Sequence, residues 1–241
     1  MGIADPYFPK EIILELATIA NANVFVETGT YLGGTTKSIA SFFKKVHTIE
    51  LSEALYEQTK DDLAQFRNIV SHLGDSRSIL PHILLENNEN IVFWLDGHYS
   101  GGITAGEEDP CPLINELNSI LSRNNDDIII IDDARLINEG MKGYPSITEI
   151  YEKMRETSKI DRCFQICDDH LYIIPNKAKY VEVLLDYVLK RSVVLWDLYS
   201  WSKYISSTKG LLRTLGVNIL EATRTLNTAR KIYKRLRHNA K

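Results

Sequence analysis

The sequence predicts an α/β fold: a doubly wound, mostly parallel seven-stranded sheet with helices on both faces, followed by a C-terminal helical extension. Three observations predict it. Short apolar strands alternate with helical segments as far as Pro175. Most of these strands end in acidic or polar residues. The strand at 127–131 contains a run of isoleucines, which is typical of a strand buried on both faces.

The stretch from Val24 to Thr36 is the most informative part of the chain. An apolar strand ends on Glu27, runs into a glycine turn at Gly29 and opens a helix near Gly33. Glycine can take a positive φ and lets a ligand approach the backbone closely. The spacing is not G-x-G-x-x-G, so a dinucleotide pyrophosphate is not the natural occupant. We expect another nucleotide-type cofactor at the carboxyl edge of the sheet.

Six further strands complete the predicted sheet. They are expected at residues 46–50, 68–73, 91–95, 127–131, 163–167 and 171–174. The first four of these end in or run into polar residues. Glu50 ends the strand at 46–50, and Gly74, Asp75 and Ser76 follow the strand at 68–73. Asp96, Gly97 and His98 follow the strand at 91–95, and Asp132 and Asp133 follow the strand at 127–131. Glu50 follows the glycine turn by about twenty residues, the spacing of an acid that binds ribose hydroxyls. Asp168–Asp169 reads as a hairpin turn between the last two strands.

Helices are predicted between the strands by apolar residues at helical spacing. They are expected at Pro9–Ala20, Glu53–Phe66, Leu80–Leu85, Pro112–Leu121 and Ser146–Glu156. The first of these should pack on the sheet and cover the cofactor. Pro112 suits a first helical turn.

The chain changes character after Pro175, which divides it into a domain at 1–177 and a helical extension at 178–241. Helices are expected at 178–189 and 193–201, with a break at 206–210. A long helix should begin at Asn218 and carry an apolar stripe of Ile219, Ala222, Leu226, Ala229, Tyr233 and Leu236. Its other face is basic, with Arg224, Arg230, Lys231, Lys234, Arg235 and Arg237. We favour self-packing or a homodimer through this helix over membrane attachment.

The strand-end motifs resemble those of class I S-adenosylmethionine-dependent methyltransferases, over roughly Asn23 to Pro175. The stretch from Glu27 to Gly33 resembles that family's first motif, and Glu50 its ribose-binding acid. The resemblance implies a Rossmann-like fold with an antiparallel final strand. The cofactor-binding residues that it implies are Glu27, Thr28, Gly29, Thr30, Tyr31, Gly33, Glu50, Ser52, Asp75, Ser76 and Asp96.

Within that superfamily, the stretches 94–102, 131–135 and 144–146 are similar to the macrocin and novobiocin-type sugar O-methyltransferases, which use a divalent metal. The resemblance implies Asp96, Asp132 and Asp133 as ligands of Mg²⁺ or Mn²⁺ and a sugar or glycosylated acceptor. The chain departs from these enzymes at His98 and Tyr99 and in the acidic insertion Glu107–Asp109. The acceptor therefore does not carry over from the resemblance.

Chemistry favours the same arrangement. A hydroxyl is a poor nucleophile until it loses its proton or binds a metal, and carboxylates are the ligands that Mg²⁺ prefers. Asp96 and His98 are the expected catalytic residues, with His98 as general base.

Other interpretations stay open for these residues. Asp132–Asp133 and Asp75 could cap helices. His98 could act as base in a metal-independent O-methyltransferase whose aspartates are structural. The chain could also be a non-catalytic scaffold that binds the cofactor and recruits a partner enzyme, although the retained strand-end acids argue against it.

Composition sets the remaining expectations. The chain has 241 residues, 44% of them hydrophobic and 25% charged, with a formal net charge of −4. No apolar run approaches the roughly 20 residues needed to cross a bilayer, so we expect a cytoplasmic protein. Its three cysteines lack metal-binding spacing and should be reduced thiols. Basic residues confined to a terminal helix do not form a nucleic-acid-binding module. The partner that the resemblance implies is a small-molecule or glycan acceptor.

Overall fold

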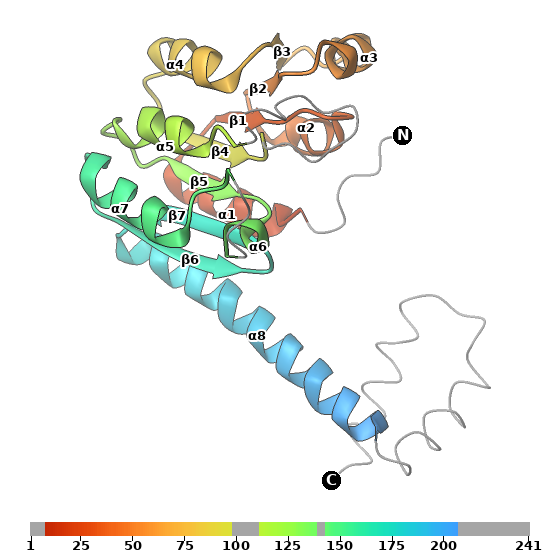
Figure 1. Cartoon of the computed structure of the whole chain (residues 1–241), viewed down its shortest axis with the longest axis vertical. Helices are drawn as coiled ribbons and strands as arrows, with labels where there is room; N and C mark the ends of the chain where they lie inside the picture. The colour runs from red at the N-terminus through yellow and green to blue at the C-terminus, as the bar shows by residue number, and fades with distance from the viewer. Residues whose placement is uncertain (1–7, 98–110, 139–142, 207–241) are drawn as a thin grey trace, which may run out of the picture. The chain divides into compact units, whose positions relative to one another are not determined.

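The computed structural model describes residues 8–97, 111–138 and 143–206, with residues 193–206 as backbone. A seven-stranded sheet in the order β3-β2-β1-β4-β5-β7-β6 forms its centre (Figure 1). The strands are β1 Val24–Thr28, β2 Lys45–Glu50, β3 Ile69–Leu73, β4 Ile91–Leu95, β5 Ile128–Ile131, β6 Arg162–Cys167 and β7 His170–Pro175. The helices are α1 Lys10–Ala20, α2 Gly34–Ile39, α3 Glu53–Leu63, α4 Ser76–Glu86, α5 Leu113–Leu121, α6 Ala134–Asn138, α7 Ile147–Thr157 and α8 Ala178–Ser206, with a 3₁₀ turn at Ala40–Phe42.

The central strands are apolar because both of their faces are covered. Every residue of β1, β4 and β5 is buried, whereas the edge strands β3 and β6 are only partly buried. Strands β1 to β5 pair in parallel, and β7 is antiparallel to both β5 and β6. The predicted fold class, with its reversed final strand, is therefore confirmed.

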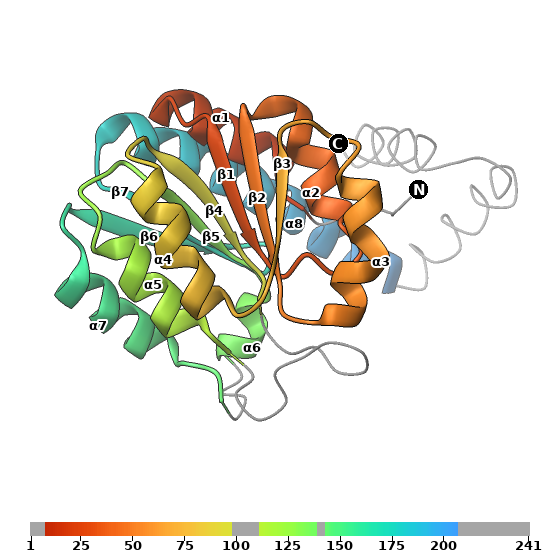
Figure 2. The same cartoon turned by 90° about the horizontal axis from the view of Figure 1, so that it is seen from above.

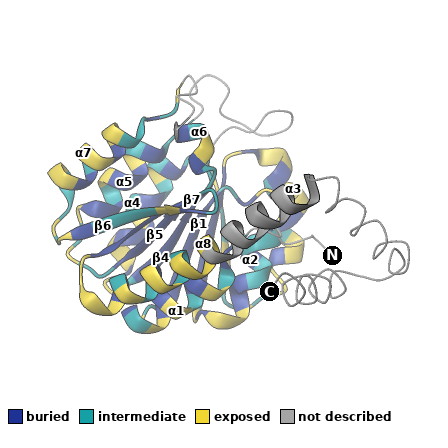
Figure 3. Cartoon of the chain, turned by 90° about the horizontal axis from the view of Figure 1, so that it is seen from below, coloured by how far each residue is buried: buried dark blue, intermediate teal, exposed yellow. Residues whose placement is uncertain are grey.

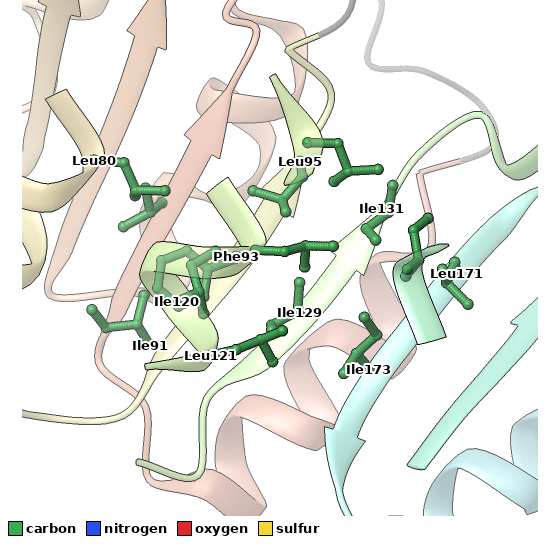
Figure 4. Packing of buried hydrophobic residues seen from close by; sticks show 14 of the residues in the cluster. Leu80, Ile91, Phe93, Leu95, Ile120, Leu121, Ile129, Ile131, Leu171 and Ile173 are labelled. Atoms are coloured by element: carbon green, nitrogen blue, oxygen red, sulfur yellow. The ribbon is translucent and has the colours of Figure 1, made fainter. Parts of the chain in front are cut away.

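Helices cover the two faces of the sheet as separate layers (Figure 2). Helices α1 and α2 and the start of α8 pack over one face, where Phe25, Trp94 and Tyr172 are buried. Helices α4, α5, α6 and α7 cover the other face, and Figure 4 shows Phe93 and Ile129 in that apolar layer. Buried residues accordingly concentrate on the sheet and on the inner sides of the helices (Figure 3). This double cover leaves the ends of the strands as the place for polar side chains.

Three helical predictions need correction. Helix α4 begins at Ser76 rather than Leu80, because Asp75 caps it there. A short helix, α6, occupies residues expected to be loop. The segment 178–206 is one continuous helix, α8, instead of two, since no glycine or proline interrupts it. The hairpin at Asp168–Asp169 is confirmed.

The compact unit that contains the sheet extends to Val188, where Tyr180 and Leu184 of α8 belong to its core. A second unit begins at Leu189 and is helical backbone up to Ser206. The expected stripe and basic face at 219–237 lie outside the described residues. No helix in the described ranges is long and apolar enough to cross a membrane. Cys111, Cys163 and Cys167 form no disulfide.

Candidate cofactor and acceptor site

The carboxyl ends of five parallel strands are tied into one row by backbone hydrogen bonds between neighbouring loops. These bonds run from Gly74 N to Glu50 O (2.8 Å), from Gly29 N to Ile49 O (2.9 Å), from Asp96 N to Thr28 O (3.0 Å) and from Asp132 N to Leu95 O (3.1 Å). The polar residues predicted at separate strand ends therefore lie along one edge of the sheet. We call the side from β1 to β3 the cofactor half and the side of β4 and β5 the acceptor half.

The glycine turn after β1 packs against the loop that follows β4. Gly29 has φ +84°, and a Cβ atom there would lie 2.2 Å from the backbone oxygen of Asp96. Glycine is therefore required by the chain's own backbone, independently of any ligand. Tyr31 also has a positive φ, of 48°, and its side chain is 54% exposed at the rim.

Glu50 shapes the turn from the neighbouring strand. Its Oε2 accepts the backbone N–H of Tyr31 and its Oε1 that of Ser52, each at 2.8 Å. An ionised carboxylate has about four lone-pair sites, so two such bonds leave capacity for ribose hydroxyls. The two hydrogen bonds therefore leave room for Glu50 to bind ribose, and this role stays a prediction.

Glu27 lies beneath the turn and is almost fully buried. Its Oε2 accepts hydrogen bonds from the hydroxyls of Thr36 and, at 2.7 Å, Thr48. Burial raises the pKa of Glu27 to about 7, although these two bonds lower it, and the nearby Glu50 adds to the rise. Thr30 joins the same network through a 2.6 Å contact with the Thr48 hydroxyl. Glu27 and Thr30 thus support the turn from inside, and their contact with cofactor stays a prediction.

Two of the predicted cofactor-binding residues, Asp75 and Ser52, cap helices. Asp75 caps α4 by accepting the N–H of Arg77 at 2.8 Å, which confirms the capping interpretation. The Arg77 guanidinium also binds this carboxylate and holds the pKa of Asp75 below its usual range. Ser52 caps α3 through the N–H of Leu55, and Ser76 opens α4 in a buried position. Contacts of Asp75, Ser52 and Ser76 with the cofactor stay predictions.

A small hollow, open to solvent, lies in the acceptor half. The residues that line it are Leu95, Gly97, Cys111, Pro112, Leu113, Glu116, Ile131, Asp132, Asp133, Ile137 and Tyr144. It brings the predicted pair Asp132–Asp133 together with Glu116, which is 1% exposed. A Cβ atom on Gly97 would lie 3.4 Å from the Oε1 atom of Glu116, so this carboxylate approaches the loop after β4.

Tyr144 gives the hollow a hydroxyl beside its carboxylates. Burial raises the pKa of Tyr144 to about 12, and Cys111, Asp133 and Asp96 add to the rise. The phenol therefore keeps its proton at neutral pH and can donate it in a hydrogen bond.

The two aspartates after β5 both contact basic side chains. Asp132 Oδ1 accepts the backbone N–H of Asp133 at 2.7 Å and lies 3.3 Å from Nε2 of His170. Asp133 has φ +54° and pairs with Nη1 of Arg135 at 2.5 Å. Within 8–97, 111–138 and 143–206, no three His, Cys, Asp or Glu side chains lie close enough to hold one metal ion.

Sequence reasoning assigned no role at this site to Glu116, Tyr144 or His170. Glu116 falls on the buried face of α5, between Leu113 and Leu117, and a carboxylate on an apolar face is a signal that could have found it. The predicted base His98 lies outside the described residues, as does Glu107–Asp109.

Comparison with known proteins bears on the fold. No family model and no curated protein matches the chain. Among solved structures, the chain is similar to the O-methyltransferase TomG from Streptomyces achromogenes, involved in tomaymycin synthesis and solved with S-adenosylmethionine. The TM-score is 0.50 and the identity 14%, over 70% of this chain and 80% of that chain.

Two further solved structures fall slightly below this score. A methyltransferase from Podospora anserina bound to S-adenosylhomocysteine has a TM-score of 0.49 at 14% identity, over 68% of this chain and 76% of that chain. An O-methyltransferase from Bacillus cereus has 0.48 at 16% identity, over 72% and 84%. The likeness to TomG shows that this chain has a Rossmann-like methyltransferase fold.

Proposed function

We propose that this protein is an S-adenosylmethionine-dependent O-methyltransferase that methylates a hydroxyl of a sugar or glycosylated acceptor with the help of a divalent cation. The observation that carries the proposal is the continuous row of strand ends, in which Glu50, Gly29, Asp96 and Asp132 follow one another along one edge. In doubly wound sheets, ligands bind outside this edge. One end of the row suits a nucleoside and the other a polar acceptor.

The backbone conformation of the cofactor half supports the proposal that it binds S-adenosylmethionine. The turn after β1 is held by Glu50 from outside and Glu27 from inside, which keeps it in one conformation. Glu50 retains lone pairs for ribose hydroxyls. TomG, which shares the fold, was solved with S-adenosylmethionine.

The carboxylate side chains of the acceptor half support the proposal that it binds a cation. Asp132 and Asp133 line the hollow, and Asp96 and Asp133 both act electrostatically on Tyr144. Carboxylate oxygens are the ligands that Mg²⁺ and Mn²⁺ prefer. Asp96, Asp132 and Asp133 would hold the ion, and they have to turn toward a common point to do so, because their side chains do not converge in the structure described.

In the proposed reaction, the acceptor oxygen attacks the methyl carbon, the bond from that carbon to sulfur breaks, and its electrons remain on the neutral thioether. S-adenosylmethionine, when bound, would supply the activated methyl group, and a cation held by Asp96, Asp132 and Asp133 would lower the pKa of the acceptor hydroxyl. His98 is the proposed acceptor of the hydroxyl proton. Tyr144, protonated at neutral pH, donates a hydrogen bond to the acceptor instead of acting as base.

The sugar as acceptor rests on the resemblance of 94–102, 131–135 and 144–146 to sugar O-methyltransferases. Vicinal hydroxyls of a catechol would satisfy the same carboxylates. Acceptor assays should therefore compare sugars bearing vicinal hydroxyls with catechol, with methyl transfer followed by mass spectrometry.

Calorimetry tests the cofactor and the cation without knowledge of the acceptor. S-adenosylhomocysteine is titrated first, and Mg²⁺ is then titrated into the complex, for the wild type and for Asp132→Asn. We expect both ligands to bind the wild type and only the cation to be lost in the variant. Absence of S-adenosylhomocysteine binding would overturn the methyltransferase proposal. Cofactor binding with near-normal turnover in Asp132→Asn would favour the metal-independent enzyme, and cofactor binding without turnover on any acceptor would favour the scaffold.

A further inference from the structure

Two histidines on neighbouring strands contact each other beneath the cofactor half. His47 lies in β2 and His72 in β3, and their rings stack with centroids 5.2 Å apart and 19° between the ring planes. Nδ1 of His47 lies 2.9 Å from Nε2 of His72, which is hydrogen-bond distance. We call these two residues the histidine pair. Because a neutral imidazole has one donor and one acceptor, a single hydrogen joins the two rings.

The register of the sheet directs both rings toward α4. Ile49 lies directly opposite His72, and His47 precedes Ile49 by two residues, so the three side chains share one face of the sheet. Ile49 belongs to the apolar layer under α4 and α5. In that layer His47 is 2% exposed and His72 is partly buried. A polar ring there costs desolvation energy unless it is hydrogen-bonded, and the pair supplies that bond.

The surroundings of His47 fix the direction of this hydrogen bond. Its Nε2 atom is buried and has no hydrogen-bond partner among the described residues. A hydrogen on Nε2 would be a buried donor without an acceptor, so the hydrogen lies on Nδ1 and is donated to Nε2 of His72. His72 then carries its own hydrogen on Nδ1.

A further proton breaks this bond. On Nε2 of His72 it would face the Nδ1–H of His47 across 2.9 Å, with two donors and no acceptor. If His47 moved its hydrogen to Nε2 to make room, that hydrogen would be buried without a partner. Both arrangements of the charged pair are therefore less stable than the neutral pair.

Charged groups on β2 and α4 act on the pair. Burial, with Lys45 and His72 adding to the effect, lowers the pKa of His47 to about 4. Burial and Lys45 also lower the pKa of His72, whereas Glu86 on α4 raises it. In β1, Glu27 shares the opposite face of the sheet with Phe25 and binds Thr36 and Thr48 there.

The remaining charged groups of the helices beside β2 and β3 have other surroundings. On α4, Arg77 binds Asp75, and His82 is exposed. The four acids of α3 are exposed, and its Lys60 pairs with one of them: Glu53, Glu57, Asp61 and Asp62. Lys45 and Glu86 are thus the charged side chains that bear on protonation of the pair.

Strand β3 leads directly into the cofactor half. It is the edge strand of the sheet and pairs with β2 alone (Figure 1). Gly74, the residue after β3, donates its N–H to the backbone oxygen of Glu50, and Asp75 then caps α4. A change in the pairing of β3 therefore moves residues that shape the cofactor half.

We propose that the histidine pair is a pH-sensitive link, which holds β3 on β2 while both rings are neutral and releases β3, with Gly74 and Asp75, in acid. In the released strand His47 takes up a proton at its ordinary pKa of 6.5, above the value of about 4 in the paired strand, so release is favoured as the pH falls below 6.5. For His47 alone, release should be favoured roughly 30-fold at pH 5 relative to pH 7.5. The consequence for cofactor binding rests on the proposed function.

Amide hydrogen exchange measures the release without any ligand. Protection of the amides of Ile69–Leu73 is compared with that of Val24–Thr28 in the central strand β1, at pH 7.5 and pH 5, after correction for the intrinsic pH dependence of exchange. We expect the open population of β3 to rise roughly 30-fold at pH 5, with β3 less protected than β1. A β3 protection that ignores pH would overturn the proposal, as would equal protection of β3 and β1 at pH 5, because the sheet would then open as one unit.

The double variant His47→Gln/His72→Gln separates titration from hydrogen bonding. Two amide side chains supply a donor and an acceptor between the strands, and neither titrates in this range. We expect the pH response of β3 to be lost. His82→Gln, which removes an exposed histidine of α4, is the matched control and should keep the wild-type response. A wild-type response in the double variant would overturn the proposal.

Nitrogen-15 chemical shifts of the rings test the pair in the wild type, whether or not the double variant folds. At pH 7.5 we expect both His47 and His72 to carry their hydrogen on Nδ1. A hydrogen on Nε2 of His47 would overturn the proposal, because His72 would then donate from Nε2 and could take up a proton on Nδ1 without breaking the bond.

Calorimetric titration of S-adenosylhomocysteine at both pH values tests the consequence for the cofactor half. The affinity should fall more between pH 7.5 and pH 5 in the wild type than in the double variant. The difference between the two proteins is the measure, because Glu27 also titrates in this range. Equal falls would overturn the effect on the cofactor half. If the wild type binds no S-adenosylhomocysteine at pH 7.5, the proposed function fails, while hydrogen exchange still decides the release of β3.

Discussion

The cofactor and acceptor halves of the sheet edge use acidic residues in opposite ways. In the cofactor half, Glu27 and Glu50 bind hydroxyls and backbone N–H groups from residues near them in the sheet. In the acceptor half, Asp132 and Asp133 contact basic side chains, His170 and Arg135. The hydroxyl and N–H donors of the cofactor half are uncharged, so they fix the turn after β1 without adding a positive charge beside its carboxylates. The guanidinium of Arg135 is positively charged, so a cation that bound Asp133 would compete with it.

This difference teaches what each half is prepared for. The hydrogen bonds of the turn after β1 are internal, so under the proposed function it would bind the cofactor without rearrangement. The carboxylates after β4 and β5 do not converge among the described residues. Under the proposed function, they would have to reorganise to hold an ion.

The strongest test of the completed turn is Gly29→Ala. The new Cβ would meet the backbone oxygen of Asp96 at 2.2 Å, and φ is +84°, so both the turn and the loop after β4 must move. Left-handed strain and overpacking together should lower the free energy of unfolding by roughly 2–5 kcal/mol. S-adenosylhomocysteine binding should be lost. Urea unfolding and calorimetry measure the two effects.

Gly33→Ala provides the matched control. Its φ is also positive, at +69°, but the new Cβ would meet the end of the flexible Leu63 side chain at 3.1 Å. Only the backbone strain should remain, about 1 kcal/mol. Equal losses in the two variants would show that the conformation, and not the contact with Asp96, sets the requirement for glycine.

The next largest effect is on the pH dependence of stability, and the substitution Glu27→Gln tests it. The folded-state pKa of Glu27 is about 7, above the ordinary 4.5, so its contribution to stability is fully present below pH 4.5 and is lost as pH rises through 7. Between pH 5 and 8 the wild type should lose about 2–3 kcal/mol from this group. Glutamine does not titrate, so this part of the slope should vanish in the variant.

Urea unfolding at pH 5 and pH 8 measures the two slopes, and their difference cancels all other titrating groups. Glu11→Gln serves as the comparison, because Glu11 is an exposed acid on α1, and its removal should leave the wild-type slope unchanged. Identical slopes in wild type and Glu27→Gln would mean that Glu27 is not buried as an acid, and the inner support of the turn would need another explanation.

Most of the cofactor half could be predicted from the sequence because its signals are local. Glu27, Gly29 and Gly33 lie within one strand–turn–helix segment, and Glu50 ends the next strand. A parallel sheet then brings such strand ends to one edge whatever the details of packing. Helix α4 shows what a periodic pattern alone misses. The pattern placed its start at Leu80, whereas the interpretation of Asp75 as a helix cap places it at Ser76, where the structure has it.

The acceptor half could be predicted only in part. Asp96, Asp132 and Asp133 follow strands, so their place at this edge was predictable, although their roles stay predictions. His170 reaches Asp132 through the antiparallel register of β5 and β7. That register depends on the hairpin turn and on packing over more than thirty residues, which no local pattern encodes. Glu116 enters the hollow from a helix whose periodicity explains its position but not its neighbour.

The smallest expected effect is the loss of stability on removal of an exposed ion pair in the acceptor half. Arg135 binds Asp133 and Asp169, but its side chain is 54% exposed, so solvent and salt screen these pairs. Arg135→Gln should therefore lower the free energy of unfolding by less than about 1 kcal/mol, and 1 M NaCl should abolish the difference. Lys37→Gln, which removes the exposed pair with Asp62, should behave alike. A loss in the free energy of unfolding above about 2 kcal/mol that salt does not reduce would contradict this, because exposed pairs do not stabilise so strongly. The ion pairs of the acceptor half would then stabilise the protein as much as the buried hydrogen bonds of Glu27 do. The contrast between the two halves would be wrong.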